Sequence, residues 1–219
     1  MMYKAVFFDF DYTLGDATDC IVAGFHYAFE RMGLEKPEYE AVRNTIGMTL
    51  ENAYTLLSGD GDAAHQAEFR RLYVEKANPL QVKETRLFPG AVELLDQLKA
   101  DGVTVAIVST KRSDVIYDIL AYKNLSDRVA VVVGGSEAAH PKPAPDAALL
   151  ALSTAGLKPS EALFVGDTVI DAETACRAGV DFAAVCNGTT PASAFAAWPH
   201  VFVARDLPAL NEWLYQATL

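Results

Sequence analysis

The chain has few cysteines, few basic residues relative to acidic ones, and no long apolar run. Its cysteines, Cys20, Cys176 and Cys186, lie far apart and show no spacing typical of metal ligands. They are therefore expected to be small buried side chains in a reducing compartment. No stretch of about 18 or more apolar residues is present, which argues against a membrane-spanning helix.

Positive charge is also scarce. Lys and Arg number 18 against 29 Asp and Glu, and the net charge is −11. This balance argues against nucleic acid and acidic membranes as partners, because no basic stripe is present to attract them. The first apolar stretch is short and is interrupted by Asp9 and Asp11, unlike a signal peptide. We therefore expect a cytoplasmic protein, which can still bind phosphate where a metal ion and a lysine focus positive charge locally.

The pattern of apolar residues predicts an α/β fold. After Pro89, helical segments alternate with short β-branched runs, and a further apolar run covers residues 4–10. This alternation is typical of a Rossmann-like, doubly wound parallel sheet. The expected strands are 4–10, 103–110, 128–135, 162–167, 180–186 and an edge strand at 200–204; the expected helices are 90–100, 113–123, 145–155, 169–178 and 206–216.

Residues 16–83 differ from the rest because their apolar side chains recur at helical spacing throughout. Helices are expected after Asp16, from Pro37 to about Asn44, and over 50–57 and 63–77. The sequence thus predicts an α/β core domain of residues 1–15 and 84–219, interrupted by an all-helical cap domain of residues 16–83.

Polar side chains gather where the predicted strands end. In open α/β sheets, ligands bind outside the carboxyl ends of the strands. Residues from distant parts of the sequence are therefore expected to meet there. The candidates are Asp9 and Asp11 after the first strand, Ser109 and Thr110 after the second, Lys142 in the loop after the third, and Asp167 after the fourth, with Asp171 one helical turn further on.

These residue types suit phosphoryl transfer. Two carboxylates two residues apart favour a cation between them, and Mg²⁺ prefers oxygen ligands. Asp9 is a candidate nucleophile, and Asp11 is a candidate general acid and then general base. The Ser109 hydroxyl, the Thr110 N–H and Lys142 are candidate partners of the phosphoryl oxygens. Thr13 is a candidate for a local hydrogen bond in the turn.

Each of these signals is weak by itself. Acidic residues often end strands as solvated turn residues, and a lone lysine usually lies on the surface. Their order and their shared place at strand ends strengthen the functional interpretation. Lys142 also lies among prolines, in a stiff loop suited to directing a side chain inward.

Four segments resemble the motifs of the haloacid dehalogenase superfamily, in the same order: FDFDYTLGD (8–16), IVST (107–110), KPAPD (142–146) and GDTVIDAETACRAG (166–179). The resemblance covers the whole chain, and the helical insert is similar to the cap of its phosphoglycolate phosphatase and β-phosphoglucomutase subgroup. It implies that Asp9, the Asp11 carbonyl and Asp167 hold Mg²⁺ with support from Asp171, and that a cap closes over the substrate. Asp11 and Asp167 argue against dehalogenation, since the dehalogenases lack the second aspartate of the pair.

Two departures from the family pattern stand out. Tyr12 occupies a position where glycine is common, and Ala17 occupies one where serine is common. In the cap, residues 43–49 are similar to the subgroup's specificity loop. Arg43 or Asn44 is then a candidate contact for the part of the substrate beyond the phosphate, whereas the simpler interpretation makes Arg43 an exposed cation at a helix end.

The sequence therefore predicts a magnesium-dependent phosphatase of small phosphorylated metabolites, with an aspartyl-phosphate intermediate on Asp9. A β-phosphoglucomutase-like transferase shares every core residue and remains an alternative. A pyrophosphatase or nucleotidase is another, and a non-catalytic binding protein with the same fold is less favoured because all core acids and Lys142 are present. Substrate and oligomeric state are not determined by these patterns.

Overall fold

The computed structural model describes residues 3–216, which form two compact units. The sheet unit contains the described residues up to Asp16 and from Leu87 onward, and the helical unit comprises Ala17–Arg86. The first boundary thus falls after Asp16 rather than after residue 15, and the second after Arg86 rather than after residue 83. Residues 1–2 and 217–219 of the predicted core domain lie outside the described residues.

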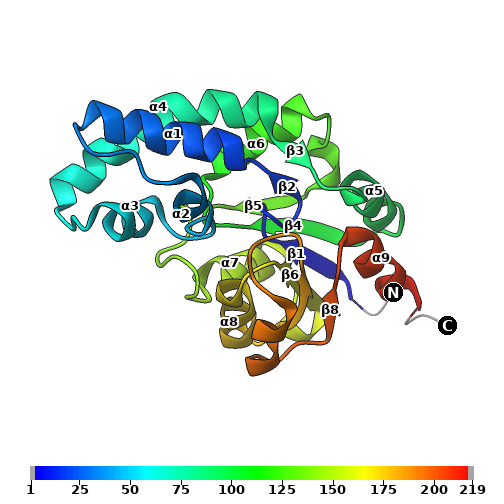
Figure 1. The fold of residues 1–219 in the computed structure, drawn as a ribbon. Helices are drawn as coiled ribbons and strands as arrows, with labels where there is room; N and C mark the ends of the chain where they lie inside the picture. Colours follow the sequence, from blue (N-terminus) through cyan, green and yellow to red (C-terminus); the bar gives the residue numbers. More distant parts are fainter. Residues whose placement is uncertain (1–2, 217–219) are drawn as a thin grey trace. The chain divides into compact units, whose positions relative to one another are not determined.

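The sheet unit contains a parallel six-stranded sheet in the order β5-β4-β1-β6-β7-β8 (Figure 1). From β1 the chain moves outward through β4 and β5, then returns to β6 on the other side of β1. This reversal confirms the predicted doubly wound sheet and brings the carboxyl ends of β1, β4 and β6 together. All six predicted strands are present: β1 (Ala5–Phe8), β4 (Thr104–Val108), β5 (Val131–Val133), β6 (Ala162–Gly166), β7 (Asp181–Val185) and β8 (Phe202–Ala204).

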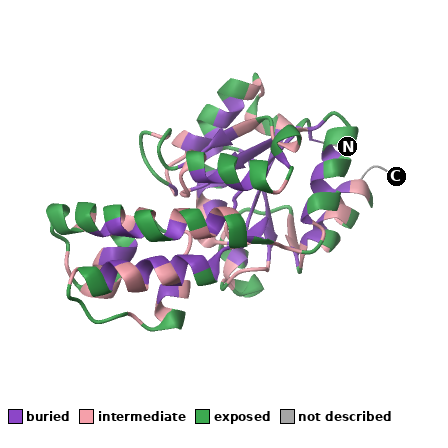
Figure 2. Ribbon diagram, turned by 90° about the horizontal axis from the view of Figure 1, so that it is seen from above, coloured by how far each residue is buried: buried purple, intermediate pink, exposed green. Residues whose placement is uncertain are grey.

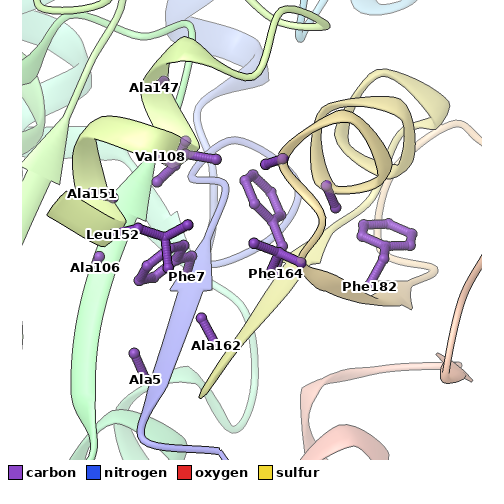
Figure 3. Packing of buried hydrophobic residues seen from close by; sticks show 14 of the residues in the cluster. Ala5, Phe7, Ala106, Val108, Ala147, Ala151, Leu152, Ala162, Phe164 and Phe182 are labelled. Atoms are coloured by element: carbon purple, nitrogen blue, oxygen red, sulfur yellow. The ribbon is translucent and has the colours of Figure 1, made fainter. Parts of the chain in front are cut away.

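Helices cover the sheet on both faces. Helices α5 (Ala91–Ala100) and α6 (Ser113–Tyr122) lie on one face, and α7 (Asp146–Ala155) and α8 (Val169–Ala178) on the other (Figure 1), the arrangement expected of right-handed crossovers. On the latter face, Phe7 and Phe164 point from β1 and β6 into a core lined by small residues of α7 and α8 (Figure 3). The final helix α9 (Leu207–Gln216) contacts β8 and α5. The central strands are buried on both sides, which makes them rigid supports for whatever follows their carboxyl ends.

The helical unit consists of α1 (Thr18–Arg31), α2 (Tyr39–Arg43), α3 (Leu50–Ser58) and α4 (Ala63–Glu84). Figure 2 shows the buried residues of its long helices on facing sides. Its core is aromatic: the Phe69 ring lies 4.9 Å from the rings of both Phe25 and Tyr54. Gly24 lets α1 approach α4 closely, because a Cβ atom there would lie 2.7 Å from the Cβ of Ala77.

Some local details differ from the sequence-based expectations. Helix α4 continues to Glu84 instead of ending at residue 77, with Pro79 inside it. Burial of Ala77 and Gln81 favours this continuation over the cost of one missing N–H. Short elements were not predicted: the two-stranded sheet of β2 (Gly15–Asp16) and β3 (Arg86–Leu87), and the 3₁₀ turns η1 (Ser126–Arg128), η2 (Pro159–Glu161) and η3 (Ala192–Ala197). Among the described residues, no helix has the length and apolarity needed to cross a membrane.

Candidate active site

A tight turn after β1 carries the first two acidic residues. The Asp9 N–H donates to the Val165 carbonyl at 2.9 Å, which ties the start of the turn to β6. The Phe10 carbonyl then accepts from the N–H groups of residues 13, 14 and 15. Tyr12 lies in this turn with φ = 58°, the left-handed region that glycine adopts most easily. The geometry thus explains why glycine suits this position, and a tyrosine here costs roughly 1–2 kcal/mol of backbone strain.

Three carboxylates meet at the carboxyl ends of β1 and β6. Asp9, Asp167 and Asp171 are each at most 2% exposed, and one oxygen from each lies within 4.8 Å of the others. Burial raises the pKa of Asp167 well above its ordinary value, and the charges of Asp171 and Asp9 raise it further. Such a cluster is unfavourable in a folded protein unless positive charge compensates it.

Lys142 supplies part of that charge. Its Nζ lies 2.5 Å from Asp171 Oδ1 and 3.1 Å from Asp9 Oδ1, and its side chain is 2% exposed. Burial by itself would lower the pKa of this lysine, but Asp171 and Asp9 outweigh that effect and raise it above its ordinary value. The proline-rich loop thus points its lysine inward, in the direction that the sequence suggested.

The carboxylate oxygens fall into two groups. Both oxygens of Asp171 are engaged by protein donors: Lys142 at Oδ1, and the N–H and hydroxyl of Thr168 at Oδ2. Asp9 Oδ1, Asp11 Oδ1 and Asp167 Oδ2, in contrast, are buried and make no hydrogen bond with the described residues. Lys142 Nζ forms an ion pair with Asp9 Oδ1 at 3.1 Å, so Asp11 Oδ1 and Asp167 Oδ2 are the buried acceptors left without a donor among the described residues. Such acceptors fit a hard cation, with Asp171 in a supporting role.

Two small residues make room for these carboxylates. A Cβ atom at Gly188, in the loop after β7, would lie 2.0 Å from Asp167 Oδ2. A Cβ atom at Gly166 would lie 2.4 Å from the Cβ of Asp171. Thr13 also acts on Asp167, because its hydroxyl donates to Asp167 Oδ1 at 3.3 Å, a longer-range bond than the local one expected. The role of Gly188 was not anticipated, since a lone glycine after a strand carries no distinctive signal.

The end of β4 contributes the second edge of the site. Ser109 is 4% exposed, and its N–H donates to the Val133 carbonyl at 3.0 Å. The register pairs Phe8 with Ile107, so Ser109 lies level with Phe10 in the turn after β1. Thr110 continues this loop and is half-buried. Two of the three predicted phosphate contacts, Ser109 and Thr110, therefore follow the strand neighbouring that of Asp9.

Lys111 is a charged residue of the site that sequence reasoning missed. Its Nζ donates to Asp11 Oδ2 at 2.8 Å, across 100 positions of sequence. The only available signal was a lysine directly after Ser109 and Thr110. Burial raises the pKa of Asp11, and the Lys111 cation opposes this without cancelling it.

Arg43 and Asn44 belong to the helical unit, at the end of α2. Arg43 Nη1 donates to Glu40 Oε2 at 3.1 Å, one turn earlier. The Asn44 N–H donates to the Glu40 carbonyl at 3.0 Å. These contacts are compatible with a helix-end cation, and a role of either residue in specificity stays a prediction.

Comparison with known proteins agrees with this geometry. The family model "Haloacid dehalogenase-like hydrolase" matches residues 6–185. The phosphoglycolate phosphatase of Aquifex aeolicus is 31% identical over 94% of this chain and 90% of its own, and "Probable phosphatase IndB" of Dickeya dadantii is 33% identical over 92% and 90%. A haloacid dehalogenase-like hydrolase from Bacteroides fragilis, solved by crystallography, superposes with a TM-score of 0.91 at 36% identity, covering 95% of this chain and 99% of that one. The chain therefore belongs to the haloacid dehalogenase-like hydrolase family and is a phosphatase.

Proposed function

We propose that this enzyme hydrolyses small phosphorylated metabolites with the help of Mg²⁺, through an aspartyl-phosphate intermediate on Asp9. One observation supports this most directly. Asp167 Oδ2 is buried without a hydrogen-bond donor among the described residues, and the neighbouring Asp9 carboxylate forms an ion pair with the buried ammonium of Lys142. A phosphate group needs this combination of a nucleophile, a cation site and a fixed positive charge.

The reaction divides into two transfers. An Asp9 carboxylate oxygen attacks phosphorus, the bond from phosphorus to the ester oxygen breaks, and Asp11 gives that oxygen its proton. Asp11 then takes a proton from water as the water oxygen attacks phosphorus and the bond from phosphorus to the Asp9 oxygen breaks, which releases inorganic phosphate and regenerates Asp9. Lys142, the Ser109 hydroxyl and the Thr110 N–H bind phosphoryl oxygens during both steps.

The residues that would hold Mg²⁺ are Asp9, the Asp11 backbone carbonyl and Asp167, with Asp171 in support. The bound ion would supply positive charge to the phosphoryl oxygens and to the clustered carboxylates. Asp171 supports the site indirectly, because it orients Lys142 through the 2.5 Å contact with Nζ. Loss of Asp171 would therefore disturb the lysine as well as the metal.

The relatives support small phosphorylated metabolites as the substrate class, and phosphoglycolate is the first compound to test. We assign the helical unit the role of a cap, with Arg43 or Asn44 contacting the part of the substrate beyond the phosphate. We also keep two predictions from the sequence: the enzyme is cytoplasmic, and it binds neither nucleic acid nor membranes. Phosphoryl transfer between positions of a hexose phosphate, or cleavage of pyrophosphate or nucleotides, would use the same core residues.

The test is phosphate release from a panel of metabolite phosphates with Mg²⁺ and with EDTA, for the wild type and Asp9→Asn. We expect release from one or a few compounds, its loss in EDTA, and a decrease of at least a thousandfold in Asp9→Asn. Asp96→Asn is the matched control, since Asp96 lies on the surface in an ion pair with Arg128 and should keep full activity. Release that persists in Asp9→Asn would refute the nucleophile. Isomerisation of a hexose 1-phosphate in place of release would favour the transferase.

A further inference from the structure

Two lysines of the sheet unit, one buried and one whose side chain is nearly so, pair with different carboxylates. Lys142 pairs with Asp9 and Asp171, whereas Lys111 pairs with Asp11. The Lys111 side chain is 7% exposed, although a lysine ordinarily extends its ammonium group into water. To keep its ammonium group against Asp11, Lys111 needs a fixed backbone position and a fixed side-chain conformation.

Hydrogen bonds in and around the loop after β4 fix the backbone of Lys111. The Lys111 N–H donates to the Ser109 hydroxyl oxygen at 3.3 Å, and the Lys111 carbonyl accepts from the Gly135 N–H at 3.0 Å. A side chain at Gly134 would collide with this loop, because its Cβ would lie 2.6 Å from the Lys111 carbonyl oxygen. The backbone of Lys111 is therefore held from both sides by neighbouring strand ends.

The side chain then reaches the turn after β1. Its Nζ lies 5.8 Å from the centre of the Phe10 ring and 2.8 Å from Asp11 Oδ2. The other oxygen, Asp11 Oδ1, is buried and makes no hydrogen bond with the described residues. The two oxygens of one carboxylate thus have different environments: Oδ2 is anchored by Lys111, whereas Oδ1 has no donor among the described residues.

We propose that Lys111 is a positioning residue that anchors Asp11 by Oδ2, so that Oδ1 is the oxygen facing the leaving group. This inference rests on the proposed function, in which Asp11 exchanges a proton with the ester oxygen. Lys111 acts on the reaction through Asp11, and its role differs from that of Lys142, which lies against the nucleophile. An unanchored Asp11 would rotate about its side-chain bonds, and proton transfer would lose its geometry.

The test compares two esters with different leaving groups. p-Nitrophenyl phosphate releases a stable anion and needs little help from a general acid, whereas phenyl phosphate needs more. In Lys111→Met, we expect kcat/KM, which reports only the first of the two transfers, to fall by about 30-fold or more with phenyl phosphate and by no more than about threefold with p-nitrophenyl phosphate, since general acids contribute ~10²–10⁴. Lys111→Arg should restore most of the loss because it keeps a donor at the same place.

A double-mutant cycle separates positioning from simple structural support. Adding Lys111→Met to Asp11→Asn should cause little further loss, because the anchored group is already absent. Lys99→Met is the matched control: Lys99 forms a 2.6 Å pair with Asp127 on the surface, and its loss should leave both esters unaffected. Melting curves with and without Mg²⁺ show whether each variant is folded.

The outcomes are distinguishable. Equal losses of kcat/KM on both esters in a folded Lys111→Met, or losses that add fully to those of Asp11→Asn, would overturn the positioning role while Asp9-dependent hydrolysis stands. A wild-type enzyme that releases no phosphate from either ester or from the metabolite panel would overturn the proposed function, and this inference with it.

Discussion

Gly188→Ala is a small substitution that should act directly on the proposed metal site. The added Cβ atom would lie 2.0 Å from Asp167 Oδ2, 3.0 Å from Asp167 Cγ and 3.1 Å from the Cβ of Tyr12. The φ angle of Gly188 is not in the left-handed region, so alanine brings no backbone strain of that kind. The effect of the substitution is therefore a steric push on one carboxylate.

The size of the effect follows from these distances. Non-bonded atoms settle at about 3.5 Å, so the Asp167 carboxylate must retreat by ~1.5 Å. Mg²⁺ demands near-ideal geometry, with ligands at about 2.0–2.1 Å, and a carboxylate displaced this far no longer serves as a ligand. We expect Mg²⁺ affinity to fall about 10–100-fold, which corresponds to roughly 1.4–2.8 kcal/mol. Overpacking should also destabilise the fold by about 1–3 kcal/mol.

Two assays measure this. The Mg²⁺ dependence of phosphate release should shift to higher concentration with a smaller change in the rate at saturation. The rise of Tm on adding Mg²⁺, which needs no substrate, should shrink in parallel. Gly61→Ala is the matched control, because the nearest atom to its new Cβ is Thr55 Cγ2 at 3.9 Å. An unchanged Mg²⁺ dependence in folded Gly188→Ala would refute the steric argument.

Three further predictions follow from other contacts. Lys142→Met leaves Asp9 and Asp171 buried without their cation, so in EDTA the free energy of unfolding should fall by about 3–5 kcal/mol in urea denaturation; a loss below about 1 kcal/mol would contradict this. Phe69→Ala removes the ring at the centre of the aromatic cluster in the helical unit and should cost about 3–5 kcal/mol by the same assay, whereas a Tm equal to the wild type would show that the cluster does not support the unit. A hydrogen bond to Asp60 raises the pKa of His65, so the pair stabilises the fold fully below about pH 6.5 and less as the pH rises through the raised pKa. The Tm difference between the wild type and His65→Ala should therefore be larger at acidic than at alkaline pH, and a difference independent of pH would refute the coupling.

Much of the fold was accessible from the sequence because it depends on local patterns. Buried parallel strands require continuous apolar runs such as those ending at Phe8 and Gly166, and helices require apolar residues at helical spacing. The ends of elements were less accessible: α4 passes through Pro79 because burial further along the helix favours continuation. The candidate site could be predicted to the same degree, since the ends of strands can be recognised in the sequence and converge in a doubly wound sheet.

By itself, the sequence determined the family, the doubly wound sheet and the residues that gather at its carboxyl edge, because each depends on the spacing and type of residues along the chain. Only the tertiary structure decided which charges meet. In the folded chain, Lys142 pairs with Asp9 and Asp171, and Lys111 pairs with Asp11. Gly188 leaves room for the Asp167 carboxylate. Some of these partners lie a hundred or more positions apart in the sequence. Their distances depend on strand order, loop paths and the absence of single side chains, none of which leaves a local pattern in the chain.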